Sequence, residues 1–397
     1  MVVMAAPLDG VLVADFSRVL AGPLCTVNLA DLGATVVKVE RPGTGDDTRA
    51  WGPPWSPHGS TYFDSVNRSK LSIALDLKEP ADQAMALELA IRADVLVENY
   101  RPGALERHGL GYEQVRSVNP GIIYCSITGF GEAAGAQLMG YDFVVQAVGG
   151  LMSITGDPDG QPTKAGVALV DVLTGKDATI GVLAALAARG RSGQGCRVQV
   201  NLLSSLLGSL VNQAQGYLET GDEPARMGNR HPSIAPYETL RCRDGLLAVA
   251  CGNDGQFVRL AAVIGSPVLS ADTRFATNSA RVAHRNDLVA ALETALAADD
   301  AAAWAIRLTA VQVPAGKVGT VADGFALAER LGLAPTVEVG PGHTRQVRQA
   351  ITFSPRLVIS PTSPPALGAD TDAVRAWLSD RSGTRLSAIH PNQKVPS

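Results

Sequence analysis

Residues 11–40 (VLVADFSRVLAGPLCTVNLADLGATVVKVE) contain the pattern that decides the fold. Val11–Phe16 is a short apolar run typical of a buried strand, and Thr35–Glu40 is a second run of the same kind. Between them, Leu24–Leu32 predicts a short helix that ends at Gly33. A strand, a helix and a strand in this order form a βαβ unit, which requires a parallel sheet.

The same alternation continues after this unit. Ser72–Leu77, Asp94–Tyr100 and Gly121–Thr128 are further apolar runs of strand length, and Pro80–Ala93 predicts a helix. The chain is therefore expected to be an α/β protein whose large, Rossmann-like domain is built on a parallel sheet. In such proteins, ligands and reactive groups gather at the carboxyl ends of the strands.

A later stretch, Ala165–Arg189, places an acid at such an end. Its first part, Ala165–Val172, is rich in valine and predicts a buried strand, followed by a turn at Leu173-Thr174-Gly175 and a helix. Asp171 lies at the end of this expected strand. A carboxylate in an apolar run is costly to bury unless it is paired or used. Capping of the helix and catalysis are both open to Asp171 at this point.

Composition limits the function. The chain carries a net charge of −4, 18% charged and 46% hydrophobic residues, which suits a folded globular enzyme. Its 397 residues are enough for two domains, or for one large domain with an insertion. No overall basic field points to nucleic acid or to a membrane surface, so neither is expected as a partner. The sequence contains no GxxxxGK[ST] motif, so no nucleoside triphosphate is expected.

The cysteines and histidines suggest neither disulfides nor a metal. The five cysteines form no CxxC pair, which indicates free thiols in a reducing cytoplasm. The six histidines are scattered and no HExxH occurs, so no metal is expected. The N-terminus lacks a signal-peptide pattern, and Val200–Val211 is too short and too polar to span a membrane.

The second half of the chain changes character. Val198–Glu219 predicts one long helix, and the irregular Asp222–Pro236 suggests a crossing between domains. Tyr237–Cys251 alternates around a turn and predicts a hairpin, which helical patterns follow. We therefore expect residues 1–220 to form the first part of the large domain, 221–325 a small α+β domain, and 326–397 a return segment that completes the large domain.

Motifs in order along nearly the whole chain resemble the family III CoA transferases, a group typified by formyl-CoA transferase. These motifs are Pro7-Leu8-Asp9-Gly10, Ala21-Gly22-Pro23, Asp31-Leu32-Gly33-Ala34, Val37–Asp46, Asn67-Arg68-Ser69-Lys70, Glu98–Gly103, Thr128-Gly129-Phe130-Gly131, Gly140-Tyr141-Asp142, Gln146–Gly150, Thr174-Gly175, Gly228–Pro232 and Val313-Pro314-Ala315-Gly316. Each motif alone is weak, but their order is specific.

The resemblance implies a mechanism and an assembly. Asp171 falls where the family has its catalytic aspartate, which attacks an acyl-CoA thioester, gives an aspartyl anhydride and then an aspartyl-CoA thioester, and passes CoA to a carboxylic acid. It also implies an interlocked homodimer in which each subunit threads a ring made by the other. Residues matching the CoA-binding positions of the family are Arg18, Val19, Arg41, Leu75, Lys78, Asn99, Tyr100, Arg107, His108, Tyr141 and Asp142.

One difference from formyl-CoA transferase and one from the racemases of the same fold bear on function. Leu20 stands where formyl-CoA transferase has a glutamine, which argues against formate or oxalate as substrates. The α-methylacyl-CoA racemases, which share the fold and the CoA site, have a histidine base where this chain has Tyr141. An un-ionised tyrosine is a poor base for an α-proton, so the racemase is the weaker alternative. A non-catalytic acyl-CoA-binding protein is the other alternative and would not need Asp171.

Overall fold

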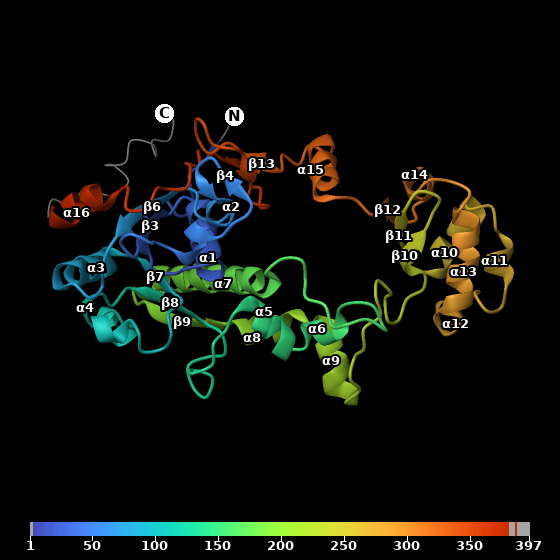
Figure 1. Ribbon diagram of the computed structural model, residues 1–397, viewed down its shortest axis with the longest axis horizontal. Coiled ribbons are helices and arrows are strands. Elements are labelled where there is room, and N and C mark those ends of the chain that lie inside the picture. Colours follow the sequence, from blue (N-terminus) through green and yellow to red (C-terminus); the bar gives the residue numbers. More distant parts are fainter. Residues whose placement is uncertain (1–2, 381–385, 387–397) are drawn as a thin grey trace. The chain divides into compact units, whose positions relative to one another are not determined.

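The expected βαβ unit is confirmed and forms the middle of a six-stranded parallel sheet. The computed structural model describes residues 3–380 and residue 386. Along the sheet the strands follow the order β6-β3-β2-β7-β8-β9 (Figure 1). Their bounds are β2 (Leu12–Asp15), β3 (Thr35–Glu40), β6 (Lys70–Ala74), β7 (Val95–Glu98), β8 (Ile123–Thr128) and β9 (Cys196–Asn201). The winding reverses between β2 and β7, and ligands bind outside the carboxyl ends of strands at such a reversal.

Helices cover both faces of this sheet, because alternate side chains of each strand point to opposite faces. Leu12 and Ala14 belong to one apolar core and Val13 to the other. The core with Val13 receives residues of α1 (Ala21–Ala30), α5 (Asp142–Val148), α7 (Leu169–Ser192) and α8 (Leu202–Ser209), and the other core receives residues of α3 (Pro80–Arg92), α4 (Tyr112–Val118) and α16 (Thr371–Ser379).

The expected strand over Ala165–Val172 is wrong. Residues from Leu169 onward belong to α7, a helix of 24 residues that also contains the expected turn at Leu173-Thr174-Gly175. Gly175 permits this arrangement, because a Cβ atom there would lie 2.7 Å from the carbonyl oxygen of Ala21 and 3.0 Å from the Cβ of Leu24. The glycine thus lets α7 pack closely on α1, and Asp171 lies in the first helical turn rather than at a strand end.

The single helix expected over Val198–Glu219 is also wrong. Its first residues belong to β9, which pairs with β8 from Cys196 to Asn201 at the edge of the sheet. The remainder is divided between α8 and α9 (Val211–Thr220). Asn201 ends the strand and starts α8, because its side-chain oxygen accepts a hydrogen bond from the amide of Ser204 at 2.8 Å.

The chain divides into two compact units. The first comprises residues up to Leu151, Ala165–Thr220 and the chain from Ala334 onward, and the second comprises Met152–Lys164 and Gly221–Leu333. Compared with the boundaries expected from the sequence, residues 152–164 join the second unit, and the chain returns to the first unit at Ala334 rather than at residue 326.

Short elements complete the first unit. The helix α5 ends at Val148, and the short helix α6 (Leu151–Ile154) follows it at the unit boundary. The other short elements are β1 (Val3–Met4) paired with β15 (Arg356–Leu357), η1 (Asp47–Ala50), β4 (Trp55–Ser56) paired with β5 (Gly59–Ser60), α2 (Thr61–Asp64), η2 (Glu106–His108), and β13 (Thr336–Val337) paired with β14 (Gln346–Val347).

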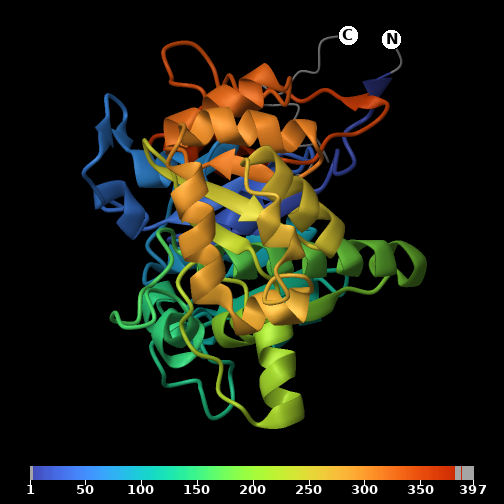
Figure 2. The same cartoon turned by 90° about the vertical axis from the view of Figure 1, so that its right-hand side faces the viewer.

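The second unit contains the expected hairpin and has its own core. The strands β10 (Tyr237–Arg241), β11 (Leu246–Ala250) and β12 (Ala315–Lys317) form an antiparallel sheet, seen from the front in Figure 2. Its helices are α10 (Asp254–Val263), α11 (Val268–Ala271), α12 (Asn278–Ala283), α13 (Arg285–Leu296), α14 (Ala301–Ala310) and α15 (Val321–Arg330). None of the helices in residues 3–380 is both long and apolar enough to cross a bilayer.

Candidate active site

A cavity of about 270 Å³ lies at the carboxyl ends of β2 and β7, where the winding of the sheet reverses. The turn after β2 contributes Arg18 and Val19, and the turn after β7 contributes Asn99 and Tyr100. Asp171 lines the same cavity from the first turn of α7. Residues from strand ends and from a helix start, far apart in sequence, therefore share one cavity.

Asn99 joins the two strand ends. Its side-chain oxygen accepts a hydrogen bond from the amide of Arg18 at 2.9 Å, and its side-chain nitrogen donates to the carbonyl oxygen of Arg18 at 2.7 Å. The Arg18 guanidinium lies 5.0 Å from the centre of the Tyr100 ring and 3.2 Å from the carboxylate of Asp47. Its Nε is buried and has no hydrogen-bond partner among the described residues. Arg18 itself lines the cavity, so its guanidinium is a candidate group for an anionic ligand.

Two acids, Asp142 and Asp171, lie at the first turn of α7 and have different roles. The carboxylate of Asp142 accepts hydrogen bonds from the amide of Val170 at 2.7 Å and from the amide of Asp171 at 3.3 Å. Asp142 therefore satisfies the free amides of the helix start, and it also accepts from the side chain of Gln146 at 2.7 Å. The capping role that the sequence left open for Asp171 is taken by Asp142. Within the described residues, the carboxylate of Asp171 makes no hydrogen bond.

The surroundings of Asp171 disfavour its charged form. Burial, reinforced by the nearby carboxylate of Asp142, raises the pKa of Asp171 to about 7. Tyr62 belongs to the same neighbourhood: burial and then the charges of Asp171 and Asp142 raise its pKa to about 12. A carboxylate that is poorly stabilised by its environment is a stronger base and a stronger nucleophile than one in water.

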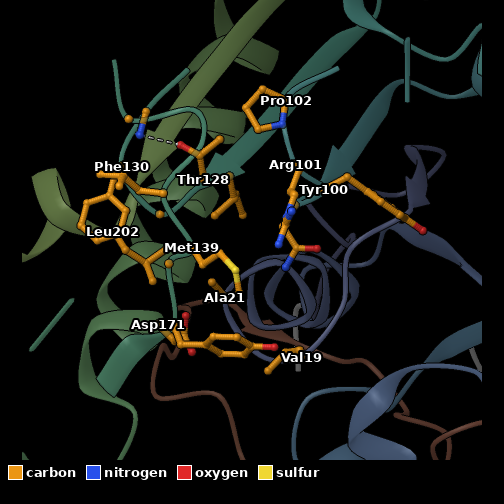
Figure 3. Close-up of a pocket in the computed structure, with 18 of the residues that line it drawn as sticks. Val19, Ala21, Tyr100, Arg101, Pro102, Thr128, Phe130, Met139, Asp171 and Leu202 are labelled. Atoms are coloured by element: carbon orange, nitrogen blue, oxygen red, sulfur yellow. Dashed lines mark hydrogen bonds between the residues drawn. The ribbon is translucent and has the colours of Figure 1, made fainter. Parts of the chain in front are cut away.

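The loop after β8, together with Ile127 of β8 and Leu202 of α8, forms an apolar wall of the cavity. Gly129 and Gly140 pack against each other so closely that a Cβ on Gly129 would lie 2.5 Å from the Cα of Gly140, which explains these two glycines of the motifs. In Figure 3, Asp171 and Val19 lie at one end of the cavity and Pro102 at the other. The apolar wall consists of Ile127, Phe130, Leu138, Met139 and Leu202.

The structure brings together only part of the residue set that the resemblance implied. Arg18, Val19, Asn99, Tyr100, Tyr141 and Asp171 line the cavity, and Asp142 lies behind Asp171. Arg41 is exposed and pairs at 2.7 Å with Asp47, the same carboxylate that Arg18 contacts.

The other four implied residues lie outside the cavity lining. Leu75 is buried in the core against α3 and α16, and Lys78 is exposed just before α3. Arg107 is exposed in η2, and the Nδ1 of His108 lies 3.2 Å from the side-chain nitrogen of Gln83. These four residues stay predictions.

Several lining residues were missed by the sequence reasoning as site residues. Thr128 ends β8 and Phe130 follows it, so the rule that ligands gather at the carboxyl ends of strands could have indicated both. The same rule does not indicate Leu202, because the sequence predicts a helix where β9 ends. Asp47 and Arg101 are the charged members of the missed set.

The fold and the cavity define a class of protein. A doubly wound sheet has its ligand site at the switch point, the arginine there suits an anionic ligand, and a carboxylate of raised pKa lines one end of the cavity. No group of three or more potential metal ligands occurs in residues 3–380 or at residue 386. An enzyme that acts on an anionic substrate with a carboxylate fits this arrangement.

The comparisons with known proteins define this class further. Residues 8–371 match CoA-transferase family III, and the chain belongs to this family. It is an enzyme that transfers CoA between an acyl-CoA and a carboxylic acid.

Two curated relatives and one solved structure are similar over most of their length. The chain is 42% identical to succinyl-CoA:glutarate CoA-transferase of Mus musculus over 92% of this chain and 85% of that protein. It is 46% identical to succinate–glutarate CoA-transferase of Agrobacterium fabrum over 81% of this chain and 82% of that protein. A CAIB/BAIF family protein from Brucella suis has the same fold, with a TM-score of 0.87, 42% identity, and coverage of 94% of this chain and 100% of that one.

Proposed function

We propose that this enzyme moves CoA between succinyl-CoA and a second dicarboxylic acid, with Asp171 as the nucleophile. The observation that carries the proposal is the state of Asp171: it lines the cavity, makes no hydrogen bond to another described residue, and has a pKa raised to about 7. The substrate class comes from the two relatives named for transfer between succinyl-CoA and glutarate.

The proposed reaction is a series of exchanges at carbonyl carbons. The carboxylate of Asp171 attacks the thioester carbonyl, the C–S bond breaks, and a mixed anhydride forms as the CoA thiolate leaves. The thiolate then attacks the aspartyl carbonyl, so the donor acid leaves and an aspartyl-CoA thioester remains. The carboxylate of the acceptor acid attacks this thioester, and the released thiolate attacks the acceptor acyl carbon. The products are the new acyl-CoA and free Asp171, and no ATP is consumed.

Burial of Asp171 suits the first of these steps. A carboxylate in water is weakly nucleophilic because water stabilises its charge, whereas the charge of Asp171 gains no hydrogen bond from its described neighbours. Asp142 contributes by occupying the amides at the start of α7, which would otherwise stabilise the charge of Asp171. Water has to be kept from the anhydride, and the apolar wall of the cavity would assist in this.

The CoA chain is proposed to cross the switch point of the sheet. Asn99 and Tyr100 on one strand end and Arg18 and Val19 on the other line this path. The unpaired Nε of Arg18 is a donor for the ligand, and Arg41 would bind phosphate on the exposed side of Asp47. Lys78, Arg107 and His108 stay predictions for the nucleotide end, and Leu75 for an apolar contact.

We also propose that the enzyme is an interlocked homodimer that acts in the cytoplasm. Large apolar side chains are exposed on α5, α7 and α9, among them Val148 at 65%, Ile180 at 64% and Leu218 at 74% of full exposure. Such side chains are costly in water and suit an interface. The five cysteines are free thiols, in keeping with a reducing compartment. A monomer in light scattering at micromolar concentration would exclude the dimer.

The function is tested by incubating the purified protein with succinyl-CoA and isotopically labelled glutarate. Labelled glutaryl-CoA is expected in the mass spectrum, and a panel of other mono- and dicarboxylic acids defines the specificity. Intact-protein mass spectra after rapid acid quenching are expected to contain CoA attached to the wild-type chain but not to Asp171→Ala. Asp177→Ala, which removes an exposed acid of the same helix, is the matched control. Turnover by Asp171→Ala at the rate of Asp177→Ala would refute the proposed mechanism.

A further inference from the structure

The turn between β2 and α1, residues 17–20, has a backbone that is unusual for its sequence. Val19 has a φ of 69°, in the left-handed region, and its branched side chain disfavours this region strongly. A free peptide with valine would populate this conformation about five- to thirtyfold less than the right-handed one. Interactions within the folded chain must therefore stabilise Val19 in this conformation. The conformation bears on the ligand site, because Arg18, Val19 and Leu20 all line the cavity.

Side chains, not neighbouring strands, bind the three successive amides of this turn. The amide of Ser17 donates to the carboxylate of Asp15 at 3.0 Å. The amide of Arg18 donates to Asn99 at 2.9 Å. The amide of Val19 donates to both carboxylate oxygens of Asp46, at 3.3 and 3.2 Å. The turn conformation is therefore set by three acceptor side chains, of which Asp46 acts at the strained residue.

Lys38 connects Asp46 to the other side of the same turn. Its ammonium donates to the carbonyl oxygen of Ser17 at 2.9 Å and lies 2.9 Å from the carboxylate of Asp46. Both side chains are fully buried. The ring of contacts thus runs from Ser17 through Lys38 and Asp46 to Val19, and it clamps the backbone on both sides of Arg18.

The pair is held in its charged form. Burial opposes the charge of Asp46, but Lys38 and the hydrogen bonds of Thr48 outweigh burial and lower the pKa of Asp46 to about 2. Burial likewise opposes the charge of Lys38, but the carboxylates of Asp15, Asp46 and Glu40 outweigh it and raise the pKa of Lys38. Asp46 does not line the cavity itself. Its contact with the ligand site runs through the amide of Val19.

We propose that Asp46, backed by Lys38, is a positioning residue that keeps Val19 left-handed and so preforms the wall of the acyl-CoA site. This inference rests on the proposed function, because it takes the cavity as the place where acyl-CoA binds. Without Asp46, the turn spends most of its time in other conformations, and the ligand has to select the minor one. The apparent affinity for CoA then falls in proportion to the fraction of protein whose turn has the binding conformation, whereas the rate at saturation changes little.

The first test is Asp46→Asn. We expect the dissociation constant of CoA, measured by calorimetry, to rise about tenfold or more, and kcat at saturating acyl-CoA to stay within about threefold of wild type. The matched control is Asp31→Asn, because Asp31 forms a comparably shielded ion pair with Arg68 at the opposite end of α1. A loss that is merely structural would appear in both variants. A folded Asp46→Asn protein with wild-type CoA affinity would overturn the proposal.

The second test uses the backbone preference of residue 19 itself. Val19→Ala and Val19→Gly both remove the branched side chain, but only glycine adopts a positive φ without strain. With Asp46 present, the two variants are expected to bind CoA equally. In the Asp46→Asn background, the glycine variant is expected to bind about fivefold more tightly than the alanine variant. The proposal would be overturned if the ratio of the CoA affinities of the Val19→Gly and Val19→Ala variants were the same with and without Asp46.

Two further measurements keep these results interpretable. If Asp46→Asn does not fold because Lys38 is left unpaired, Asp46→Glu keeps the buried charge, displaces the carboxylate by one methylene, and carries the same expectations. Wild type and Asp171→Ala are assayed for transfer in parallel. If wild type transfers CoA and the Asp46 variants bind CoA as wild type does, only the positioning role is refuted. If wild type does not transfer CoA, the proposed function is refuted.

Discussion

Replacing Asp171 by asparagine is expected to stabilise the folded protein at neutral pH and above while abolishing transfer. The carboxylate of Asp171 is partly buried, makes no hydrogen bond to another described residue, and faces the like charge of Asp142. Asparagine has nearly the same shape and no charge. The substitution therefore removes an unfavourable charge and leaves the packing of α7 in place.

The sign follows from the two protonation states. The pKa of Asp171 is 3.8 in the unfolded chain and about 7 in the native protein, so the native state binds the proton more tightly. The protonated acid contributes its full stability below about pH 4. That contribution is lost as the pH rises through about 7, because the unfolded chain ionises first. Asparagine does not titrate, so its advantage grows over this range.

The size of the effect follows from the same numbers. A pKa that rises from 3.8 to about 7 corresponds to an upper limit of about 4 kcal/mol, at 1.36 kcal/mol for each pKa unit. Because Asp171 lines an open cavity, water relieves part of this cost. We expect the free energy of unfolding of Asp171→Asn to exceed that of wild type by about 2–3 kcal/mol above pH 7.5, and by less than about 0.5 kcal/mol near pH 4.

Urea unfolding without CoA, at several pH values between 4 and 8.5, measures this difference. The two units can unfold separately, so the transition that involves the first unit is followed by the fluorescence of Trp51, Trp55 and Trp377, with Trp304→Phe as the common background. Asp177→Asn, on the exposed side of the same helix, is the control and is expected to change the free energy of unfolding little at any pH. A pH-independent difference, or a less stable Asp171→Asn at pH 8, would refute the reasoning.

Four further outcomes are expected. Asp171→Ala loses CoA transfer by orders of magnitude in a steady-state assay but binds CoA with nearly wild-type affinity in calorimetry, and transfer at a near wild-type rate would contradict the nucleophile role. Arg41→Ala and Arg107→Ala each weaken CoA binding by about 1.5–3 kcal/mol, and unchanged affinity in both would exclude them as phosphate ligands. Gly175→Ala lowers the free energy of unfolding by about 1–3 kcal/mol, because its Cβ would lie 2.7 Å from the carbonyl oxygen of Ala21. A 2-methylacyl-CoA keeps its α-proton in D₂O with the enzyme by proton NMR, and rapid enzyme-dependent exchange would favour a racemase.

Five strands of the six-stranded sheet could be predicted because they are buried on both faces. Thr35–Glu40 was predicted with the bounds that the structure has, and the strands before and after it differ by only a few residues. A strand covered by helices on both faces is mostly apolar, so its run of apolar residues is visible in the sequence. The family resemblance then indicated Arg18 and Asn99, and both follow predicted strands and meet across the switch point.

The errors occurred where distant residues decide the structure. The valines of Ala165–Val172 favour a strand only weakly, and this preference is overridden by packing on α1 and by Asp142, which satisfies the helix start. No local pattern reveals an acceptor that lies 28 residues upstream. The same holds for Cys196–Asn201, whose strand conformation depends on pairing with the distant β8. Its sequence continues into a helix without a clear break, so the strand could not be recognised from the sequence.

The buried charges of β3 were a signal that the sequence reasoning did not use. Lys38 and Glu40 interrupt an otherwise apolar strand, and charged residues that are fully buried need partners. The partners lie in the loop that follows, where Asp46 binds Lys38 and Arg49 binds Glu40 at 2.7 Å. Charges in a strand predicted to be buried therefore indicate that the next loop is anchored.

Two energetically unfavourable features of the cavity lie next to buried ion pairs that stabilise the surrounding structure. Asp171 keeps a charge that its surroundings disfavour, and Val19 keeps a backbone conformation that its side chain disfavours. Neither feature would persist unless the surrounding structure determined it. The support is the layer beneath the cavity, in which Lys38 pairs with Asp46 and Lys70 pairs with Asp15 at 3.0 Å, all fully buried. Removing a costly group should therefore stabilise the protein and impair function, whereas removing a supporting group should lower both stability and CoA affinity.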